Sequence, residues 1–347
     1  MSMNKSLMLE GTVLAGLQKQ CIEYGQMIVT FPYYRCMQIF HIAISVSAVI
    51  LIFQVFMKYW SKLIFHFNIK ILLLSLYAAS LLHAISTAVF QTYQLNLSFS
   101  YIRPCDVFLP RLFYAFFNLL YSYSNLWIEN VQMTMIFERS MAFVFVGHYE
   151  KFTKKMGVCL AIFTIVVSAF QCIWTFWNAQ FKTPQISYLF SPPESNKNID
   201  VMNNVVFVVH VIGLFAMAFI YIKQRHHQRL GETLSVRFQI CENRTSSRLL
   251  FALSVMQLTI FLIYPIALFY LKKGYDPHTS SLAVLYSNIH AAYLVPEYTL
   301  ILPIITMYFL KRAKIKRQSK IQSMIEMRAC GDEGWAIHSK HLQKQWE

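Results

Sequence analysis

The chain has little charge for its length. Only 14% of its 347 residues are Asp, Glu, Lys or Arg, whereas about a quarter is usual in soluble proteins. Glycine, proline and cysteine, at 10, 10 and 7 residues, are too few for a collagen, a low-complexity disordered chain or a small disulfide-rich domain. A chain that is 56% hydrophobic could not cover two or three water-facing domains. Composition therefore indicates an integral membrane protein.

Seven stretches lack Lys and Arg and are long enough to cross a bilayer. A spanning helix needs about 20 mostly apolar residues, because its backbone polar groups must bond within the segment. We predict an all-α, seven-transmembrane helix bundle at 36–310, between an N-terminal tail at 1–35 and a basic tail at 311–347. Apolar residues at helical spacing near Ile321 predict a short amphipathic helix in the basic tail. The expected spans are about 36–57, 71–93, 112–137, 156–178, 201–222, 249–271 and 281–310.

Basic residues set the expected orientation. Of the 31 Lys and Arg, 22 fall in one alternate set of connections and 9 in the other, which predicts an extracellular N-terminus and a cytoplasmic C-terminus. The first twenty residues lack a continuous apolar stretch, so we expect the first span to act as the insertion signal. The net charge of +15 then lies along the membrane edge, which favours a lipid bilayer as partner and argues against nucleic acid.

Two predicted spans carry polar residues along one helix face. Such faces either bond to one another between helices or line a hydrated interior, and both alternatives stay open. The acid in each face should be protonated or paired, with His83, His210 and His290 as candidate partners. The faces comprise Asn118, Ser122, Asn125, Glu129 and Gln132 in the third span, continued by Arg139 just past its end, and Tyr286, His290, Tyr293 and Glu297 in the seventh.

Motifs for catalysis or cofactors are missing from the sequence. No Lys lies in a predicted span, which excludes a retinal Schiff base, and the H-E-x-x-H, G-x-S-x-G, phosphate-loop and C-x-x-C patterns are absent. The His226–His227 doublet lies among arginines in a basic loop, where we expect a solvated surface. We therefore expect no enzyme activity, no cofactor and no metal site.

Cysteines and glycosylation motifs mark the outer face. We place Cys21 and Cys105 outside, with Cys36 at the first membrane edge, so a disulfide, if one forms, should join Cys21 to Cys105. Asn4 and Asn96 lie in external N-x-S motifs, although Asn96 is close to the second span.

The cytoplasmic end of the third span carries an acid and a base side by side. Glu138 could hold Arg139 in a resting state and release it to a partner, or Arg139 could simply extend toward the membrane surface. The connection before the sixth span mixes Arg237 and Arg248 with polar residues and could be a solvated helix extension.

Several short motifs are distributed over the whole chain. They are ERSMA at 138–142, YE at 149–150, LSVRFQICEN at 234–243, RLL at 248–250 and PEYTLILP at 296–303, together with Cys21 in the tail. In these motifs the chain resembles the nematode serpentine chemoreceptors of class alpha/beta (Srab) or the related class alpha (Sra), which are G-protein-coupled receptors.

The resemblance implies a plasma-membrane chemosensory receptor, typical of sensory-neuron cilia, that couples to a heterotrimeric G protein. Our hypothesis is that an external small-molecule ligand binds near Tyr114, Asn118, Tyr121, Tyr264, Tyr286 and His290. The G protein would then meet Glu138, Arg139, Arg237, Glu242, Asn243 and Arg248. One alternative is a ligand-gated cation channel of the odorant-receptor type, whose N-terminus would lie in the cytosol. The other is a transporter that relays protons through Glu129 and Glu297.

Overall fold

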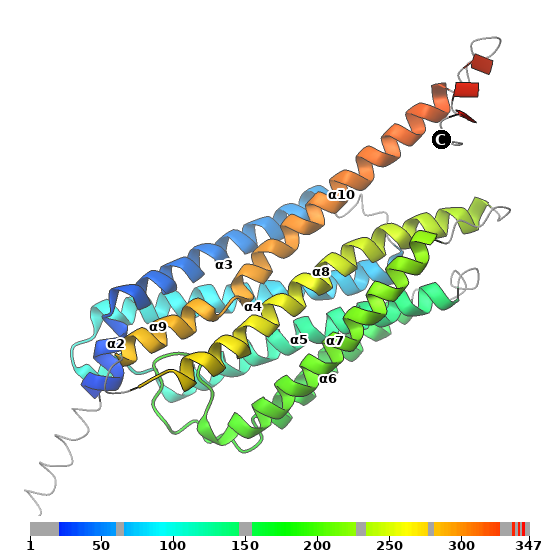
Figure 1. Cartoon of the computed structure of the whole chain (residues 1–347). Coiled ribbons are helices and arrows are strands. Elements are labelled where there is room, and N and C mark those ends of the chain that lie inside the picture. The colour runs from blue at the N-terminus through cyan, green and yellow to red at the C-terminus, as the bar shows by residue number, and fades with distance from the viewer. Residues whose placement is uncertain are drawn as a thin grey trace, which may run out of the picture. The chain divides into compact units, whose positions relative to one another are not determined.

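The computed structural model describes residues 21–59, 66–145, 155–226, 234–276 and 281–326, with the short pieces 335–336, 339–340 and 342–343. This part of the chain is built from helices, so the predicted all-α class is confirmed (Figure 1). The long helices are α3 (Pro32–Tyr59), α4 (Phe67–Ser100), α5 (Arg111–Val144), α6 (Lys155–Thr175), α7 (Asn196–His226), α8 (Leu234–Lys273), α9 (Leu282–Ala292) and α10 (Val295–Glu326). The short ones are η1 (Ile22–Gln26), α2 (Met27–Val29), η3 (Pro104–Val107) and η5 (Pro193–Ser195).

Helix α5 occupies a special position in the bundle. Six segments of the described chain are long and apolar enough to cross a membrane, and they belong to α3, α4, α6, α7, α8 and the pair α9 and α10. Helix α5 is 34 residues long, like α4, but its polar residues leave it outside this set. It contacts α4, α6, α7 and α8. Because neighbouring helices cover it, a helix with a polar face can lie at this depth.

Some element boundaries differ from the predicted spans. Helix α4 continues to Ser100, and residues 21–31, expected in a tail, form η1 and α2. The seventh span is interrupted between α9 and α10 at Tyr293 and Leu294. Pro296 explains the interruption, because it has no N–H to donate and its ring would crowd the carbonyl group of Ala292 in a continuous helix.

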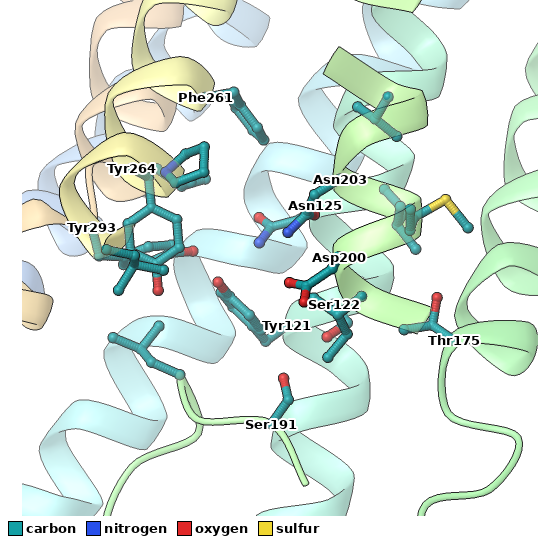
Figure 2. A pocket seen from close by; sticks show the side chains of 18 of the residues that line it. Tyr121, Ser122, Asn125, Thr175, Ser191, Asp200, Asn203, Phe261, Tyr264 and Tyr293 are labelled. Atoms are coloured by element: carbon teal, nitrogen blue, oxygen red, sulfur yellow. The ribbon is translucent and has the colours of Figure 1, made fainter. Parts of the chain in front are cut away.

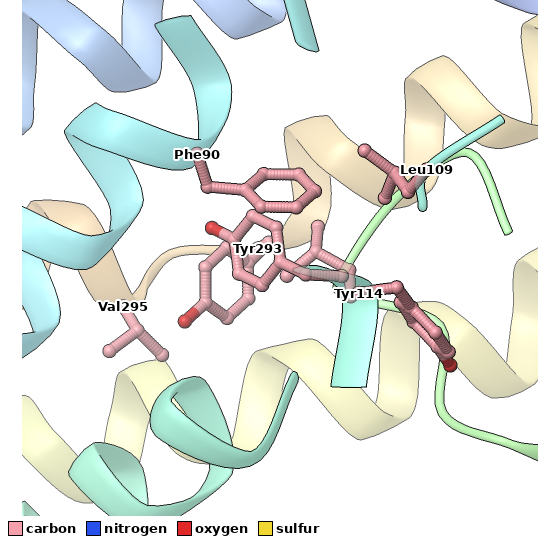
Figure 3. Packing of buried hydrophobic residues seen from close by; sticks show 7 residues of the cluster. Phe90, Leu109, Tyr114, Tyr293 and Val295 are labelled. Atoms are coloured by element: carbon pink, nitrogen blue, oxygen red, sulfur yellow. The ribbon is translucent and has the colours of Figure 1, made fainter. Parts of the chain in front are cut away.

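The chain divides into two compact units, Met1–Pro303 and Ile304–Glu347. Within the second unit, residues 311–326 are helical as a continuation of α10. All described residues of the site discussed below belong to the first unit. Its core includes an aromatic cluster at the end where α4 finishes and α5 begins (Figure 3). The buried members of this cluster are Phe90, Leu109, Tyr114, Tyr188, Leu189, Tyr293 and Val295.

Candidate ligand-binding site

A disulfide fixes the N-terminal segment, residues 21–31, to the bundle. Cys21 is bonded to Cys105 in η3 with an S–S distance of 2.07 Å and a Cα–Cα distance of 4.9 Å. The Arg35 side chain donates hydrogen bonds to the carbonyl oxygens of Val29, at 3.0 Å, and Ser98, at 2.6 Å. Ile28 and Val29 are buried. This end of the bundle, called the disulfide end below, therefore has a covalently attached cap.

A second segment closes the same end from within. The lid loop, residues 176–195 between α6 and α7, inserts Ser187 and Tyr188 among the helices, where both side chains are buried. The Tyr188 ring meets Phe90 edge-on, with ring centroids 4.3 Å apart. Burial raises the pKa of Tyr188 to about 12, so its phenol remains a neutral hydrogen-bond donor. Its hydroxyl lies 3.4 Å from the Thr87 hydroxyl of α4.

Three of the six residues predicted to bind ligand instead hold the lid loop. The Asn118 amide donates to the Tyr188 carbonyl oxygen at 2.7 Å, and the Tyr114 hydroxyl donates to the Phe190 carbonyl oxygen at 2.6 Å. His290 Nε2 lies 3.1 Å from Ser187 Oγ. These contacts satisfy lid-loop polar groups that would otherwise be buried without partners, which stabilises the inserted conformation.

A cavity of about 480 Å³ lies beneath the lid loop (Figure 2). Helices α5, α7, α8 and α9 supply most of its lining, with Leu189 and Phe190 from the loop. The other three predicted ligand-binding residues, Tyr121, Tyr264 and Tyr286, line this cavity. So do four residues of the predicted polar faces, namely Ser122, Asn125, Glu129 and Tyr293. The middle of α5 therefore faces a cavity, and the choice between a hydrated interior and bonds between helices stays open there.

The sequence did not single out two polar residues of the cavity, Asp200 and Asn203. Both lie on α7, where Figure 2 shows them near Ser122 and Asn125 of α5. The predicted fifth span, 201–222, leaves Asp200 out because a spanning segment is expected to be free of charge. The helix instead starts at Asn196, so Asp200 is one turn inside it.

Other polar residues of the predicted faces bond between helices. The Gln132 amide of α5 donates to Ser254 Oγ of α8 at 2.6 Å. His83 Nε2 lies 2.6 Å from the Tyr293 hydroxyl, and His210 Nε2 lies 3.2 Å from Gln257 Nε2. In these contacts the candidate histidines His83, His210 and His290 bond to Tyr293, Gln257 and Ser187 rather than to Glu129 or Glu297.

Glu297 is separated from the cavity. It lies in the first turn of α10, beyond the interruption at Tyr293, and it does not line the cavity. Its Oε2 atom is buried without a hydrogen-bond partner in the part of the chain that the structure describes. Within that part, no group of three or more His, Cys, Asp or Glu side chains could hold a metal ion.

Comparison with known proteins identifies the family. The sequence model described as "Serpentine type 7TM GPCR receptor class ab chemoreceptor" matches residues 19–346. The chain belongs to this family. It is 35% identical over 325 residues to "Serpentine receptor class beta-17" of Caenorhabditis elegans, covering 91% of this chain and 88% of the relative. It is 21% identical over 320 residues to "Serpentine receptor class beta-16" of the same organism, covering 90% and 92%.

The family result confirms the Srab resemblance, while the relatives carry the class beta name that the motifs had not distinguished. The protein is thus a multi-pass membrane chemoreceptor of the GPCR type, in a family of receptors and not of enzymes. This assignment favours the receptor interpretation over the channel and transporter alternatives.

In this class ab receptor, α5 ends in a buried ion pair far from the cavity. Arg139 Nε lies 2.6 Å from Glu138 Oε2, and Arg139 Nη2 lies 2.7 Å from Glu138 Oε1. Relative exposures of 1% for Arg139 and 0% for Glu138 show that the arginine does not extend toward the membrane surface. Two parallel N–H···O bonds of this kind are among the stronger interactions in proteins.

The remaining predicted residues are distributed as follows. Arg237, Glu242 and Asn243 lie in α8, but their side chains fall outside the described part of the receptor, whereas the Arg248 side chain is exposed. Asn4 lies outside the described residues, and Asn96 is exposed within α4, one turn before its end. Glycosylation of both asparagines and G-protein contact by these residues stay predictions.

Proposed function

We propose that this receptor binds an external small molecule in the cavity beneath the lid loop and, when occupied, activates a heterotrimeric G protein at the opposite end of the bundle. One observation carries the proposal. The same helix, α5, lines the cavity at Tyr121 and Asn125 and contains the buried pair Glu138–Arg139. The 18 residues from Tyr121 to Arg139 correspond to about 27 Å of helix.

This arrangement supports a mechanism for signalling along α5. A ligand in the cavity contacts α5, α7 and α8 together, so it stabilises the arrangement of these helices that fits it best. A shift of α5 against α8 changes the surroundings of Glu138 and Arg139, and release of Arg139 exposes a cation to the G protein. In this proposal the G-protein contact surface extends along α8, where it includes Arg237, Glu242, Asn243 and Arg248.

The orientation follows from charge and cysteine chemistry. The excess of Lys and Arg in alternate connections favours an extracellular N-terminus. The Cys21–Cys105 bridge supports the same orientation, because disulfides persist in oxidising compartments. We therefore assign the disulfide end to the outside of the plasma membrane. We also propose a location in sensory-neuron cilia, and the only support for it is the family resemblance.

The test is G-protein nucleotide exchange by the purified receptor in nanodiscs. Arg139→Ala should abolish the exchange, whereas Arg103→Ala, which removes an exposed arginine from the connection before α5, should leave it unchanged. Glu138→Gln should raise basal exchange, because it weakens the hold on Arg139. Misfolding cannot produce that increase. Wild-type exchange in Arg139→Ala, or no change in Glu138→Gln, would contradict the proposal.

A further inference from the structure

We infer that the cavity selects a cationic amine and that Asp200 is the counter-ion of the ligand's ammonium group. This inference rests on the proposed function, in which the cavity is the ligand site. It extends that function by naming the chemical class of the ligand, and it follows from three properties of the cavity lining.

The first property is charge. The cavity is lined by two acids, Asp200 and Glu129, and no Lys or Arg is among the described residues that line it. Opposite charges attract, and the attraction grows as a bound ligand excludes water from the lining, so a bound cation is favoured. An anionic ligand would instead be repelled by Asp200 and would meet no Lys or Arg among the described residues of the lining. The lining therefore discriminates by the sign of the charge.

The two acids differ in position. Asp200 is an exposed side chain one turn into α7, close to the lid loop. Glu129 lies farther along α5, eight residues or about 12 Å beyond Tyr121. A ligand that enters past the lid loop meets Asp200 first. We therefore assign the counter-ion role to Asp200, and Glu129 forms the deeper part of the same acidic lining.

The second property is the aromatic wall. Tyr121 and Tyr264 each pack against Tyr293, with ring centroids 5.5 and 5.4 Å apart, and all three residues line the cavity. Figure 2 shows the Asp200 carboxyl pointing into the space that Tyr121 faces, with Tyr264 and Tyr293 beyond it. The faces of aromatic rings attract cations, and this attraction is larger when both groups are shielded from water.

The third property is a hydrogen-bond acceptor without a donor. Asn125 lines the cavity, and its Oδ1 atom is buried without a hydrogen-bond partner among the described residues. A buried acceptor without a partner is energetically costly, so a ligand that supplies an N–H to it gains binding energy. Asn125 lines the same cavity as Asp200, so one ligand can engage both side chains. The volume of about 480 Å³ is in the range typical of sites for small organic ligands.

The experiment compares three probes that share one ring and a two-carbon chain: phenethylamine, 2-phenylethanol and phenylacetate. Binding is measured as the concentration-dependent rise in Tm of the purified receptor in nanodiscs. Phenethylamine should raise Tm, and the neutral and anionic probes should not at the same concentrations. Asp200→Asn should weaken phenethylamine binding by at least about tenfold, because a charge-assisted hydrogen bond is lost.

The matched control is Asp276→Asn, which removes an exposed acid just after α8, outside both the cavity lining and the lid loop. It should bind phenethylamine like the wild type. Asp200→Lys, which reverses the charge, should abolish phenethylamine binding and let phenylacetate raise Tm. That gain separates loss of a counter-ion from loss of the fold.

Three results would overturn the amine assignment: equal binding of 2-phenylethanol, unchanged phenethylamine binding in Asp200→Asn, or no binding of phenethylamine by the wild type. Nucleotide exchange measured in the same nanodiscs keeps the two proposals apart. If nucleotide exchange depends on Arg139 but the cavity shows no preference for the cationic probe, the amine assignment is overturned and the proposed G-protein coupling stands. Cation binding without any exchange would contradict the proposed G-protein coupling and leave the cavity's selectivity in place.

Discussion

The disulfide end of the receptor is closed by two segments that are held in different ways. The N-terminal segment is bonded covalently through Cys21 and buries Ile28 and Val29. The lid loop contains no cysteine and depends on hydrogen bonds from α5 and on the buried Tyr188. Each such bond contributes only about 0.5 to 1.5 kcal/mol net, and the lid loop can detach without breaking a covalent bond, unlike the N-terminal segment. The two segments therefore differ in what must be lost before each of them can open.

Backbone conformation differs between the two segments as well. Phe181 of the lid loop has φ 49°, in the left-handed region that a bulky residue rarely adopts. Its ring packs near Phe176 and Tyr114, with centroid distances of 6.0 and 5.6 Å. No such residue occurs in the described N-terminal segment. Aromatic packing therefore holds the lid loop in a strained conformation, which further favours opening on this side.

The largest expected effect comes from breaking the covalent attachment. Cys105→Ser should lower the free energy of unfolding by about 2 to 5 kcal/mol, because the disulfide restricts the unfolded chain between positions 84 residues apart. The measurement is thermal unfolding of the purified receptor. Cys36→Ser is the control, since Cys36 is exposed and not in a disulfide. Equal stability of Cys105→Ser and wild type would mean that noncovalent contacts alone hold both segments.

The next effect comes from loosening the lid loop at its deepest backbone anchor. Asn118→Leu leaves the buried Tyr188 carbonyl group without its donor, which should cost about 1 to 3 kcal/mol. We expect faster hydrogen exchange at residues 186–190, with exchange in the N-terminal segment unchanged. Asn96→Leu, at an exposed position on α4, is the matched control. Exchange that accelerates equally in both segments would show that they open together and remove the distinction between them.

Sequence reasoning succeeded for the parts of this site that depend on one helix. The spacing of polar residues along α5 depends only on the helix itself. Ser122, Asn125 and Glu129 could therefore be assigned to one face of α5 without knowledge of the neighbouring helices. The path of the lid loop depends on contacts with α4, α5 and α9, which no local pattern in residues 176–195 encodes. Tyr114 and Asn118 are predicted from the sequence to contact ligand, but their bonds to carbonyl groups of the lid loop could not be inferred.

Errors in the predicted helix boundaries account for the incorrect treatment of Asp200 and Glu297. The criterion of charge-free spans works because charges are costly in lipid, yet a charge that faces a cavity escapes that cost. Asp200 is such a charge, so the rule that located α7 also excluded one of its functional candidates. In the seventh span, helical spacing grouped Glu297 with Tyr286, but the interruption at Tyr293 ends the regular repeat on which that grouping depends.

The smallest expected effect comes from removing one hydroxyl group that holds the lid loop, which tests whether the lid loop opens independently of the N-terminal segment. Tyr114→Phe deletes the donor to the Phe190 carbonyl oxygen while retaining the ring, and it should cost about 0.5 to 1.5 kcal/mol. If the lid loop opens independently, this loss should appear as faster hydrogen exchange near Phe190 and not in the N-terminal segment. Tyr33→Phe, at an exposed position in α3, should change neither segment. A fall in Tm with unchanged exchange near Phe190 would instead assign the Tyr114 hydroxyl to stability of the whole bundle, and Asn118 would then be the main anchor of the lid loop.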